Sequence, residues 1–230
     1  MGITIRPATE LDTLSLGQIN IASFRHQPFW GNLFPNIPDT EAGTLPLKTA
    51  RCLDKLVAPN VHVLAAVDDI SGRVVGYARW MVPADENGDG KSAVELKEQA
   101  NVELLNRHKA GNTFPVGTRM DLYHAFQELL KDVEGRLVRE GDFVLELLAT
   151  HPEAQGRGVG TALLNWGLER ANKRNARVYL EATEDGYPLY WKYGWRDVEV
   201  IEIDFTRFGG EGRQQWTVMV RERGGVVAAA

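Results

Sequence analysis

"THPEAQGRGVGTALL", residues 150–164, places three glycines at alternate positions, Gly156, Gly158 and Gly160, directly before a helical pattern. Glycine adopts backbone angles that other residues avoid, and it lets a ligand approach the main chain closely. The start of the following helix offers unpaired N–H groups and a partial positive charge. We therefore expect this turn to hold an anionic group, for which phosphate is the natural candidate.

Other interpretations of the glycine turn differ in the ligand that they require. The phosphate loop of ATPases needs GxxxxGK[ST], and that pattern fails because no lysine follows Gly160. The dinucleotide fingerprint GxGxxG, counted from Gly156, needs glycine or alanine where Thr161 stands, and only Glu181 favours it, as a candidate ribose contact. A glycine-rich connector that holds no ligand also remains open.

The segments on either side of the turn predict its place in the fold. Residues 143–150 (FVLELLAT) form a largely apolar run typical of a buried strand, and residues 178–183 (VYLEAT) form a second one. Between them, residues 161–174 repeat apolar positions at helical spacing. Two apolar strands joined by one helix predict a right-handed parallel crossover that is buried on both faces.

The N-terminal part of the chain predicts further strands and helices around this crossover. A strand, a helix, a second helix and a hairpin are expected at residues 3–6, 11–24, 41–57 and 61–83. Between the two helices, residues 26–38 are rich in proline, glycine and aromatics, which favours an ordered, non-helical loop. This loop and the insertion after the hairpin are candidates for the walls of a binding site, or for an extension of the core or a dimer contact.

A shift in composition marks the insertion. From about residue 84 to residue 142 the sequence turns to Lys, Glu, Asn and Gln, with helical patterns over Ala93–His108 and Met120–Glu140. Residues 195–205 and 215–223 then alternate as antiparallel strands. We expect a single domain over residues 1–223 that carries this helical insertion, and a flexible tail at residues 224–230.

Composition and charge limit the partners of the chain. The 230 residues carry 26 Lys and Arg against 31 Asp and Glu, so neither nucleic acid nor an anionic membrane is expected as a partner. No apolar run approaches the ~18 residues needed to span a bilayer, and the first residues lack the apolar core of a signal peptide. We therefore expect a soluble, cytoplasmic protein. The lone Cys52 excludes an intramolecular disulfide, and the histidines lack metal-ligand spacing, so no bound metal is expected.

Two segments together resemble the GNAT superfamily of acyl-CoA-dependent N-acyltransferases. The first is the pattern Q-x-x-G-x-G, formed by Gln155, Gly158 and Gly160 between an apolar strand and a helix. The second is EATEDGYPLYWKYGW (residues 181–195), in which Leu-Tyr precedes Gly-Trp. The resemblance covers about residues 143–195 and is strongest to the fungal branch. It implies an α/β fold with a mixed, mostly antiparallel sheet, a splayed pair of parallel strands and flanking helices.

This resemblance implies acetyl-CoA as the co-substrate and assigns residues to it. Backbone groups of the strand before the turn bind the pantetheine arm, and the N–H of Leu148 polarises the acetyl carbonyl. The glycine turn holds the pyrophosphate, and Arg157 is either a further contact or a solvated charge. The expected cofactor-binding residues are Leu148, Ala149, Thr150, Gln155, Gly156, Arg157, Gly158, Val159, Gly160 and Thr161.

The resemblance also implies the catalytic groups. Tyr190, four residues before Gly194, is expected to act as the general acid that protonates the leaving thiolate, since a tyrosine hydroxyl with its usual pKa near ~10 is protonated at neutral pH. Glu146 lies in the middle of an apolar strand, where a carboxylate is costly unless it is paired or faces a wet cleft. Glu146 is therefore expected either to act on the acceptor amine, as its base or as an anchor for its ammonium group, or to be a structural partner of a buried hydrogen-bond donor. A chain of water molecules is the alternative base.

These assignments together predict the function. We expect an N-acetyltransferase that moves an acetyl group from acetyl-CoA to a primary amine by direct attack. The acceptor is expected to be a small molecule, because an inserted cap narrows the cleft that a peptide needs, and a homodimer is left open. A non-catalytic acyl-CoA-binding sensor and a dinucleotide-dependent oxidoreductase are the alternatives. Cys52 is expected to be a small buried hydrophobe, and His151 a capping or loop residue.

Overall fold

The computed structural model describes residues 2–37, 40–83 and 113–224. Its contacts divide the chain into two compact units. Unit 1 comprises Met1–Arg25, Ile37–Val116 and Leu145–Gly167, and unit 2 comprises His26–Asn36, Gly117–Val144 and Leu168–Ala230. The expected helical stretch Ala93–His108 and the expected tail from residue 225 onward lie outside the described residues.

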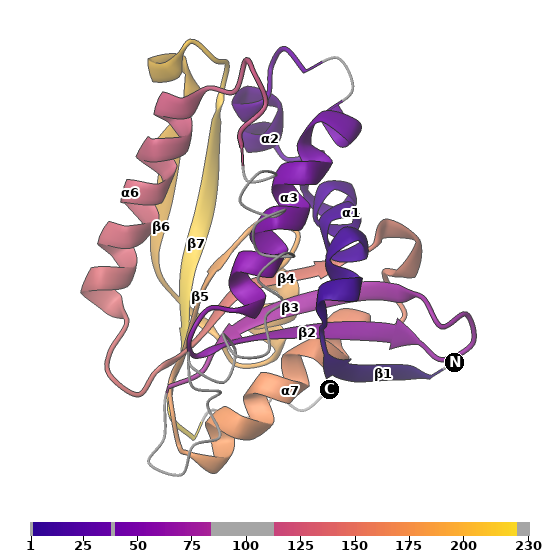
Figure 1. Ribbon diagram of the computed structural model, residues 1–230. Coiled ribbons are helices and arrows are strands. Elements are labelled where there is room, and N and C mark those ends of the chain that lie inside the picture. Colours follow the sequence, from indigo (N-terminus) through magenta and orange to yellow (C-terminus); the bar gives the residue numbers. More distant parts are fainter. Residues whose placement is uncertain (1, 38–39, 84–112, 225–230) are drawn as a thin grey trace. The chain divides into compact units, whose positions relative to one another are not determined.

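Unit 1 is built on three antiparallel strands that Figure 1 shows side by side. Each strand joins its neighbour in chain order, and the two later ones form the hairpin that the sequence predicts. Two helices pack against each other and against these strands, and each buries several apolar side chains in these contacts. The elements are β1 (Ile3–Pro7), η1 (Glu10–Asp12), α1 (Thr13–Phe24), α3 (Thr40–Leu56), β2 (Val61–Asp68) and β3 (Val74–Met81).

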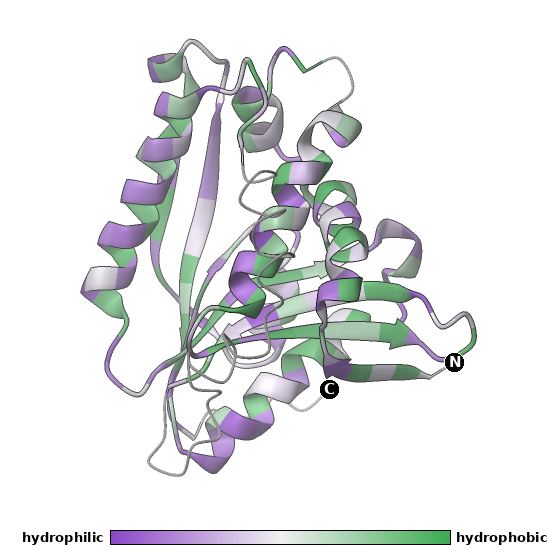
Figure 2. Ribbon diagram, in the orientation of Figure 1, coloured by the Kyte–Doolittle hydropathy of each residue, from purple (hydrophilic) through white to green (hydrophobic). Residues whose placement is uncertain are grey.

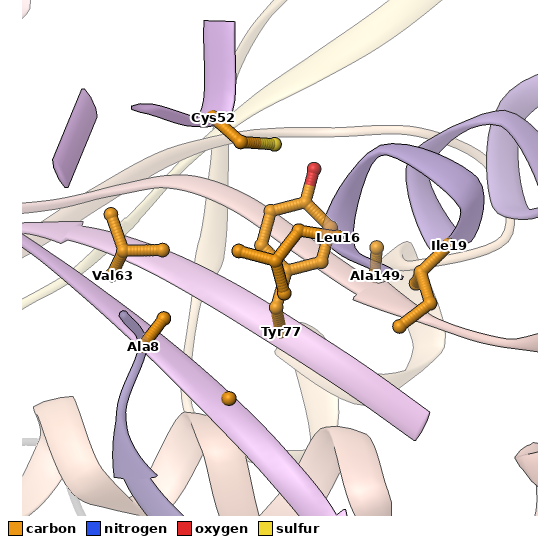
Figure 3. Close-up of a cluster of buried hydrophobic side chains, with 8 residues drawn as sticks. Ala8, Leu16, Ile19, Cys52, Val63, Tyr77 and Ala149 are labelled. Atoms are coloured by element: carbon orange, nitrogen blue, oxygen red, sulfur yellow. The ribbon is translucent and has the colours of Figure 1, made fainter. Parts of the chain in front are cut away.

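The core of unit 1 gathers side chains from both helices and from the sheet. Figure 3 shows this cluster, in which the Tyr77 hydroxyl points toward the side chain of Cys52. Cys52 is buried among apolar groups, which confirms its expected role as a small hydrophobe, and burial raises the pKa of its thiol. Asn20 donates a hydrogen bond to the Tyr77 hydroxyl over 3.0 Å, so this polar group is satisfied inside the core.

β4 (Phe143–Thr150) runs through both units and has the bounds that the sequence predicts. Its first residues, Phe143 and Val144, pair in parallel with Val178 and Tyr179 of β5 (Val178–Ala182). The seven-stranded sheet also contains β6 (Arg196–Asp204) and β7 (Arg213–Arg221), and its strand order is β1-β2-β3-β4-β5-β7-β6. Strands β4 and β5 are parallel, whereas β1–β2, β2–β3, β5–β7 and β6–β7 pair antiparallel. The expected mixed, mostly antiparallel α/β fold is therefore confirmed. The connection between β4 and β5 contains η2 (Pro152–Ala154) and α7 (Val159–Lys173).

Unit 2 contains the antiparallel strands that the sequence predicts near the C-terminus. β7 lies between β5 and β6, and a short turn with Gly209 in the left-handed conformation precedes β7. The elements of this part are α8 (Tyr187–Lys192), β6 (Arg196–Asp204), η3 (Phe205–Phe208) and β7 (Arg213–Arg221).

The aromatic segment at residues 26–38 is not the non-helical loop that the sequence predicts. It contains the short helix α2 (Pro28–Leu33), which starts at Pro28. Proline suits the first helical position because its fixed φ is already helical and its missing N–H would be unpaired there. The segment extends the core of unit 2, since Trp30 and Phe34 are buried and their rings lie 5.1 Å apart.

Phe29 of α2 belongs to an aromatic cluster in unit 2. Its ring centroid lies 4.5 Å from that of Phe126, 5.9 Å from that of Trp216 and 6.3 Å from that of Phe205. Phe126 comes from α6 (Met120–Leu137), which confirms the second helical stretch of the insertion. Figure 2 shows hydrophilic and hydrophobic residues alternating around α6, as expected of a helix with one buried face. In the described part of the chain, no helix is long and apolar enough to cross a membrane.

Candidate functional site

The glycine turn in unit 1 uses the conformational freedom of two of its three glycines. Gly156 and Gly158 have φ angles of 73° and 80°, in the left-handed region that other residues rarely adopt. A Cβ added to either would meet no heavy atom within 4 Å, so the space beside both α-carbons is open. Gly160 lies inside the first turn of α7. The turn therefore presents bare backbone to its surroundings.

The amide groups of this turn have no backbone partner among the described residues. The first bond of α7 runs from the amide of Ala162 to the carbonyl of Gly158 over 2.9 Å, so the helix does not use the preceding N–H groups. No backbone hydrogen bond is donated by residues 156–161 to any described residue. Gln155 is exposed at the start of the turn, and its own amide bonds to Pro152. An anion at this helix start would meet several free donors and the positive end of the helix dipole.

Arg157 is neither free nor simply solvated. Its guanidinium forms an ion pair with the carboxylate of Asp68, which is buried at the end of β2. Asp68 also accepts hydrogen bonds from the amides of Ile70 and Ser71, so it caps the β2–β3 turn. These amide bonds, together with Arg157, lower the pKa of Asp68 to about 2. The ion pair thus ties the glycine turn to the hairpin.

The Asp68 contacts predict an acid-dependent part of the stability. The folded carboxyl has a pKa of about 2, whereas an unfolded aspartate takes up its proton near ~3.9. As pH falls from about 4 to about 2, the unfolded chain binds the proton first, so this contribution to the free energy of unfolding is lost. We expect Asp68→Asn to be less stable than wild type near neutral pH, with a difference that shrinks over this window. Urea unfolding at a series of pH values measures it.

The matched control for this prediction is the neighbouring Asp69→Asn, on the exposed part of the same turn. It should change stability little at any pH. A gap between wild type and Asp68→Asn that stays constant from neutral pH to about pH 2 would contradict the assigned role of the charge.

The end of β4 places the predicted pantetheine-binding residues close to the glycine turn. Leu148 and Thr150 are half-buried and Ala149 is buried. The carbonyl of Thr150 accepts a hydrogen bond from the Ser23 hydroxyl of α1 over 3.0 Å. A Cβ on Gly76 of β3 would lie 3.0 Å from the Ala149 carbonyl oxygen, so glycine is needed for this close approach. The binding roles of these three residues stay predictions.

Glu146 is paired with two cations in unit 1. Its Oε1 lies 2.8 Å from Nζ of Lys55 on α3, and its Oε2 lies 3.7 Å from Nε of Arg79 on β3. Further cationic side chains lie close to Arg79. Burial, together with Arg51 and Arg79, lowers the pKa of Lys48 to about 7. Of the alternatives left open by the sequence, these contacts favour the structural partner, since the carboxylate already holds a charged donor.

Tyr190 lies in α8 of unit 2, within the expected second segment. It is 7% exposed, and its ring forms an edge contact with Trp195 at a centroid distance of 5.9 Å. A Cβ on Gly186 would lie 2.8 Å from Cε2 of Tyr190, so the ring packs directly on this glycine. None of the described residues hydrogen-bonds the Tyr190 hydroxyl. Burial raises the pKa of Tyr190, so its hydroxyl remains protonated across the neutral range.

Two further polar residues considered in the sequence have local partners. His151 is the N-cap of η2, and its ring nitrogen accepts a hydrogen bond from the Glu153 amide over 3.4 Å, which confirms the expected capping role. Glu181 of β5 accepts a hydrogen bond from the Tyr179 hydroxyl over 2.7 Å. Within the ranges that the structure covers, no group of three or more His, Cys, Asp or Glu could hold a metal ion.

One hydrogen-bond network beside Tyr190 was not predicted from the sequence. His26 Nε2 and Gln27 Nε2 both approach Asp185 Oδ2, at 2.8 Å and 2.6 Å. Gln214 donates to Gln27, and the amide of Phe29 donates to Gln214. Asp185 directly precedes Gly186, on which the Tyr190 ring packs. No sequence signal joins His26 to Asp185, because 159 positions separate them and only the fold of unit 2 brings them together.

Comparisons with known proteins identify the family and the fold of this chain. A sequence model of the acetyltransferase (GNAT) family matches residues 29–195. A curated acetyltransferase from the fungus Stachybotrys chartarum is 26% identical over 152 residues, covering 65% of this chain and 61% of that protein. The chain thus spans less than two thirds of that relative's length.

Solved structures show the same fold. One is described as histone acetyltransferase HPA2 and related acetyltransferase from Corynebacterium glutamicum, with a TM-score of 0.61, 21% identity, and coverage of 97% of this chain and 98% of that chain. Another is arylalkylamine N-acetyltransferase 2 from Aedes aegypti, with a TM-score of 0.54, 14% identity, and coverage of 96% and 99%. At these identities the likeness concerns the fold alone.

Proposed function

Because the chain belongs to the acetyltransferase (GNAT) family, we propose that it is an N-acetyltransferase that moves an acetyl group from acetyl-CoA to a primary amine. Membership of the family makes the protein an acyltransferase. We propose in addition that the transferred group is acetyl, that the acceptor is an amine, and that the residues act as described below. The observation that carries it is the glycine turn, with open space at Gly156 and Gly158 and amides that no described residue engages.

The residues of the turn suit a pyrophosphate group. The amides from Gly156 to Thr161 donate to its oxygens in our proposal, including those of Arg157, Val159 and Gly160. The Arg157 side chain then serves indirectly, since its pairing with Asp68 holds the turn in place. Gln155 is exposed at the edge of the turn, where its side chain is available for a phosphate contact.

The backbone of β4 supplies the remaining contacts to the thioester. We assign the pantetheine arm to main-chain groups of Leu148, Ala149 and Thr150, and polarisation of the carbonyl to the N–H of Leu148. A donor aimed at the carbonyl oxygen stabilises the negative charge that grows there as the amine attacks. Because these contacts use the backbone, the side chains at these positions are replaceable.

Tyr190 is the proposed general acid. As the C–N bond forms and the C–S bond breaks, sulfur departs as a thiolate that needs a proton. A buried tyrosine with a raised pKa is fully protonated under working conditions, and its hydroxyl is engaged by no described residue. The hydroxyl is therefore available to protonate the sulfur. Glu146 has no proton-transfer role in this proposal, because Lys55 and Arg79 already pair with its carboxylate.

A small-molecule acceptor is the remaining part of the proposal. The net charge of −5 is compatible with a cationic amine as substrate. The half-buried Phe29 and Phe126 of the aromatic cluster offer an apolar contact within unit 2 for the body of such an amine. A cytoplasmic location and a homodimer remain expectations. Sedimentation of the purified protein measures its oligomeric state.

Calorimetric titration with acetyl-CoA, CoA, NADH and ATP tests the cofactor. We expect the CoA species to bind and NADH and ATP not to bind, because the turn lacks the features of the other two motifs. A screen for thiol release with a panel of amines then tests turnover; it includes an arylalkylamine and a histone peptide, after the names of the two fold neighbours. Binding of CoA without turnover of any amine supports the sensor alternative, and a preference for NADH contradicts the proposal.

A further inference from the structure

The network around His26 lies beside the proposed acid and has the geometry of an oriented base. We propose that His26 is the group that takes the proton from the acceptor ammonium, with Asp185 as its positioning residue. This inference rests on the proposed function, because it needs an amine acceptor and Tyr190 as the acid. All of the residues in its support belong to unit 2.

The tautomer of His26 follows from its partner. Nε2 of His26 lies 2.8 Å from Asp185 Oδ2, and a carboxylate oxygen only accepts hydrogen bonds. Nε2 also lies 3.1 Å from Gln27 Nε2, but that amide directs its hydrogen to Asp185 Oδ2 over 2.6 Å. We therefore assign the Nε2 hydrogen of His26 to the same carboxylate oxygen, which is its nearer partner. The other ring nitrogen, Nδ1, then holds the free lone pair. An imidazole fixed in this way presents Nδ1 as the proton acceptor.

A relay of amides fixes the position of Asp185. Gln27 Nε2 donates to Asp185 Oδ2 over 2.6 Å, and Gln27 Oε1 accepts from Gln214 over 3.1 Å. Gln214 is 8% exposed, and its Oε1 accepts from the Phe29 amide over 2.7 Å. The backbone amide at the end of this relay is a fixed donor, so each amide side chain has one defined orientation. His26 and Asp185 are themselves 56% and 62% exposed, so the dyad is accessible to a substrate.

The dyad is close to Tyr190 through the chain itself. Asp185 is bonded to Gly186, and the Tyr190 ring packs on the α-carbon of Gly186. The turn is held by hydrogen bonds from the amides of Gly186 and Tyr187 to the carbonyl of Thr183. During acyl transfer, the attacking nitrogen and the leaving sulfur are bonded to the same carbonyl carbon. The base for the nitrogen must therefore lie near the acid for the sulfur, and the link from His26 through Asp185 to Gly186 makes His26 our candidate.

Together, His26 and Tyr190 account for every proton that moves in the reaction. The acceptor enters as an ammonium ion and gives one proton to Nδ1 of His26, which passes it to solvent. The neutral nitrogen forms the C–N bond with its lone pair, and the electrons of the C–S bond leave with sulfur. Tyr190 protonates the thiolate, and the second proton lost by the nitrogen restores the tyrosine hydroxyl. The net products are the amide, the free thiol and one proton.

Substitution of His26 tests this proposal. We expect His26→Gln to lower kcat/KM for the amine roughly 100-fold at neutral pH, within the range for loss of a general base. Acetyl-CoA affinity and the thermal midpoint should stay near wild type, because His26 is exposed. The matched control is His124→Gln, an exposed histidine on α6 of the same unit, which should keep wild-type activity.

Two further variants separate a base from a structural residue. Added imidazole should restore activity to His26→Ala, because a free imidazole can replace the missing base but not a missing contact. Asp185→Asn should lower kcat in the wild-type background and have no further effect in His26→Ala, as expected for a residue that acts through His26.

The outcomes distinguish this inference from the proposed function. Active wild-type enzyme with an equally active His26→Gln overturns the base assignment and leaves the proposed function intact. A loss of activity in His26→Ala that imidazole does not restore also overturns it. Absence of turnover by the wild-type protein with every amine overturns both.

Discussion

Tyr190→Phe should lower kcat by about 100- to 1,000-fold while the dissociation constant for acetyl-CoA changes less than about twofold. The substitution removes one oxygen and keeps the ring, so the contact with Trp195 and the packing on Gly186 persist. The expected loss therefore reports the proton that the hydroxyl supplies to the departing sulfur. Thiol release at saturating substrate measures kcat, and calorimetry measures affinity.

The control for this prediction lies in the same helix. Tyr187 precedes Tyr190 by less than one turn, and its exposed hydroxyl bonds to Asp197 over 3.1 Å. Tyr187→Phe should leave kcat within about twofold of wild type, since an exposed hydrogen bond contributes little. Equal kcat in wild type and Tyr190→Phe would remove Tyr190 from the mechanism. Because burial raises the pKa of Tyr190, we also expect no alkaline loss of activity from this group below about pH 10.

Gly158→Val should weaken acetyl-CoA binding at least about 100-fold, which is roughly 2.7 kcal/mol of binding free energy. Gly158 has a φ of 80°, which a β-branched residue adopts only with strain, and its side chain would fill the open space beside the turn. The valine would therefore both move the amides and block the approach of the pyrophosphate. Calorimetry on the folded variant measures the loss.

A second glycine separates loss of binding from loss of folding. Gly141 of unit 2 also has a positive φ, 86°, with no heavy atom within 4 Å of an added Cβ. Gly141→Val should show a similar drop in the thermal midpoint and bind acetyl-CoA normally. Gly158→Ala, which introduces less strain, should fold and still bind more weakly than wild type. Wild-type affinity in both folded Gly158 variants would refute the assignment of the turn.

Local patterns predicted most of the elements of this protein. The apolar run at residues 143–150, in which Glu146 is the one charged residue, became β4 with the predicted bounds, because an interior strand of a sheet needs a largely apolar sequence. The hairpin was equally clear, since its turn residues lie between two β-rich runs. The glycine turn was recognised because the left-handed angles at Gly156 and Gly158 exclude most other residues.

Patterns were less reliable where position within an element mattered. A helix was predicted over residues 11–24, but Leu11 and Leu14 in this range are 89% and 54% exposed. Leu11 lies in η1, before α1 begins, so its distance in sequence from the apolar residues of α1 does not show which face of α1 is buried. The segment around Pro28 was expected to lack a helix, although proline at the first position favours one.

By itself, the sequence determined the family, the mixed sheet and the turn that we assign to the cofactor, since each depends on residue types at short spacing. Only the tertiary structure decided what the charged residues contact. Arg157 meets Asp68 across 89 positions, Glu146 meets Lys55 across 91, and His26 meets Asp185 across 159. Charged side chains pair with whatever the folded backbone brings within a few ångströms, and no local pattern encodes a contact between distant segments. The physical reason is that propensity and periodicity act within one element, whereas ion pairs form between elements after they pack.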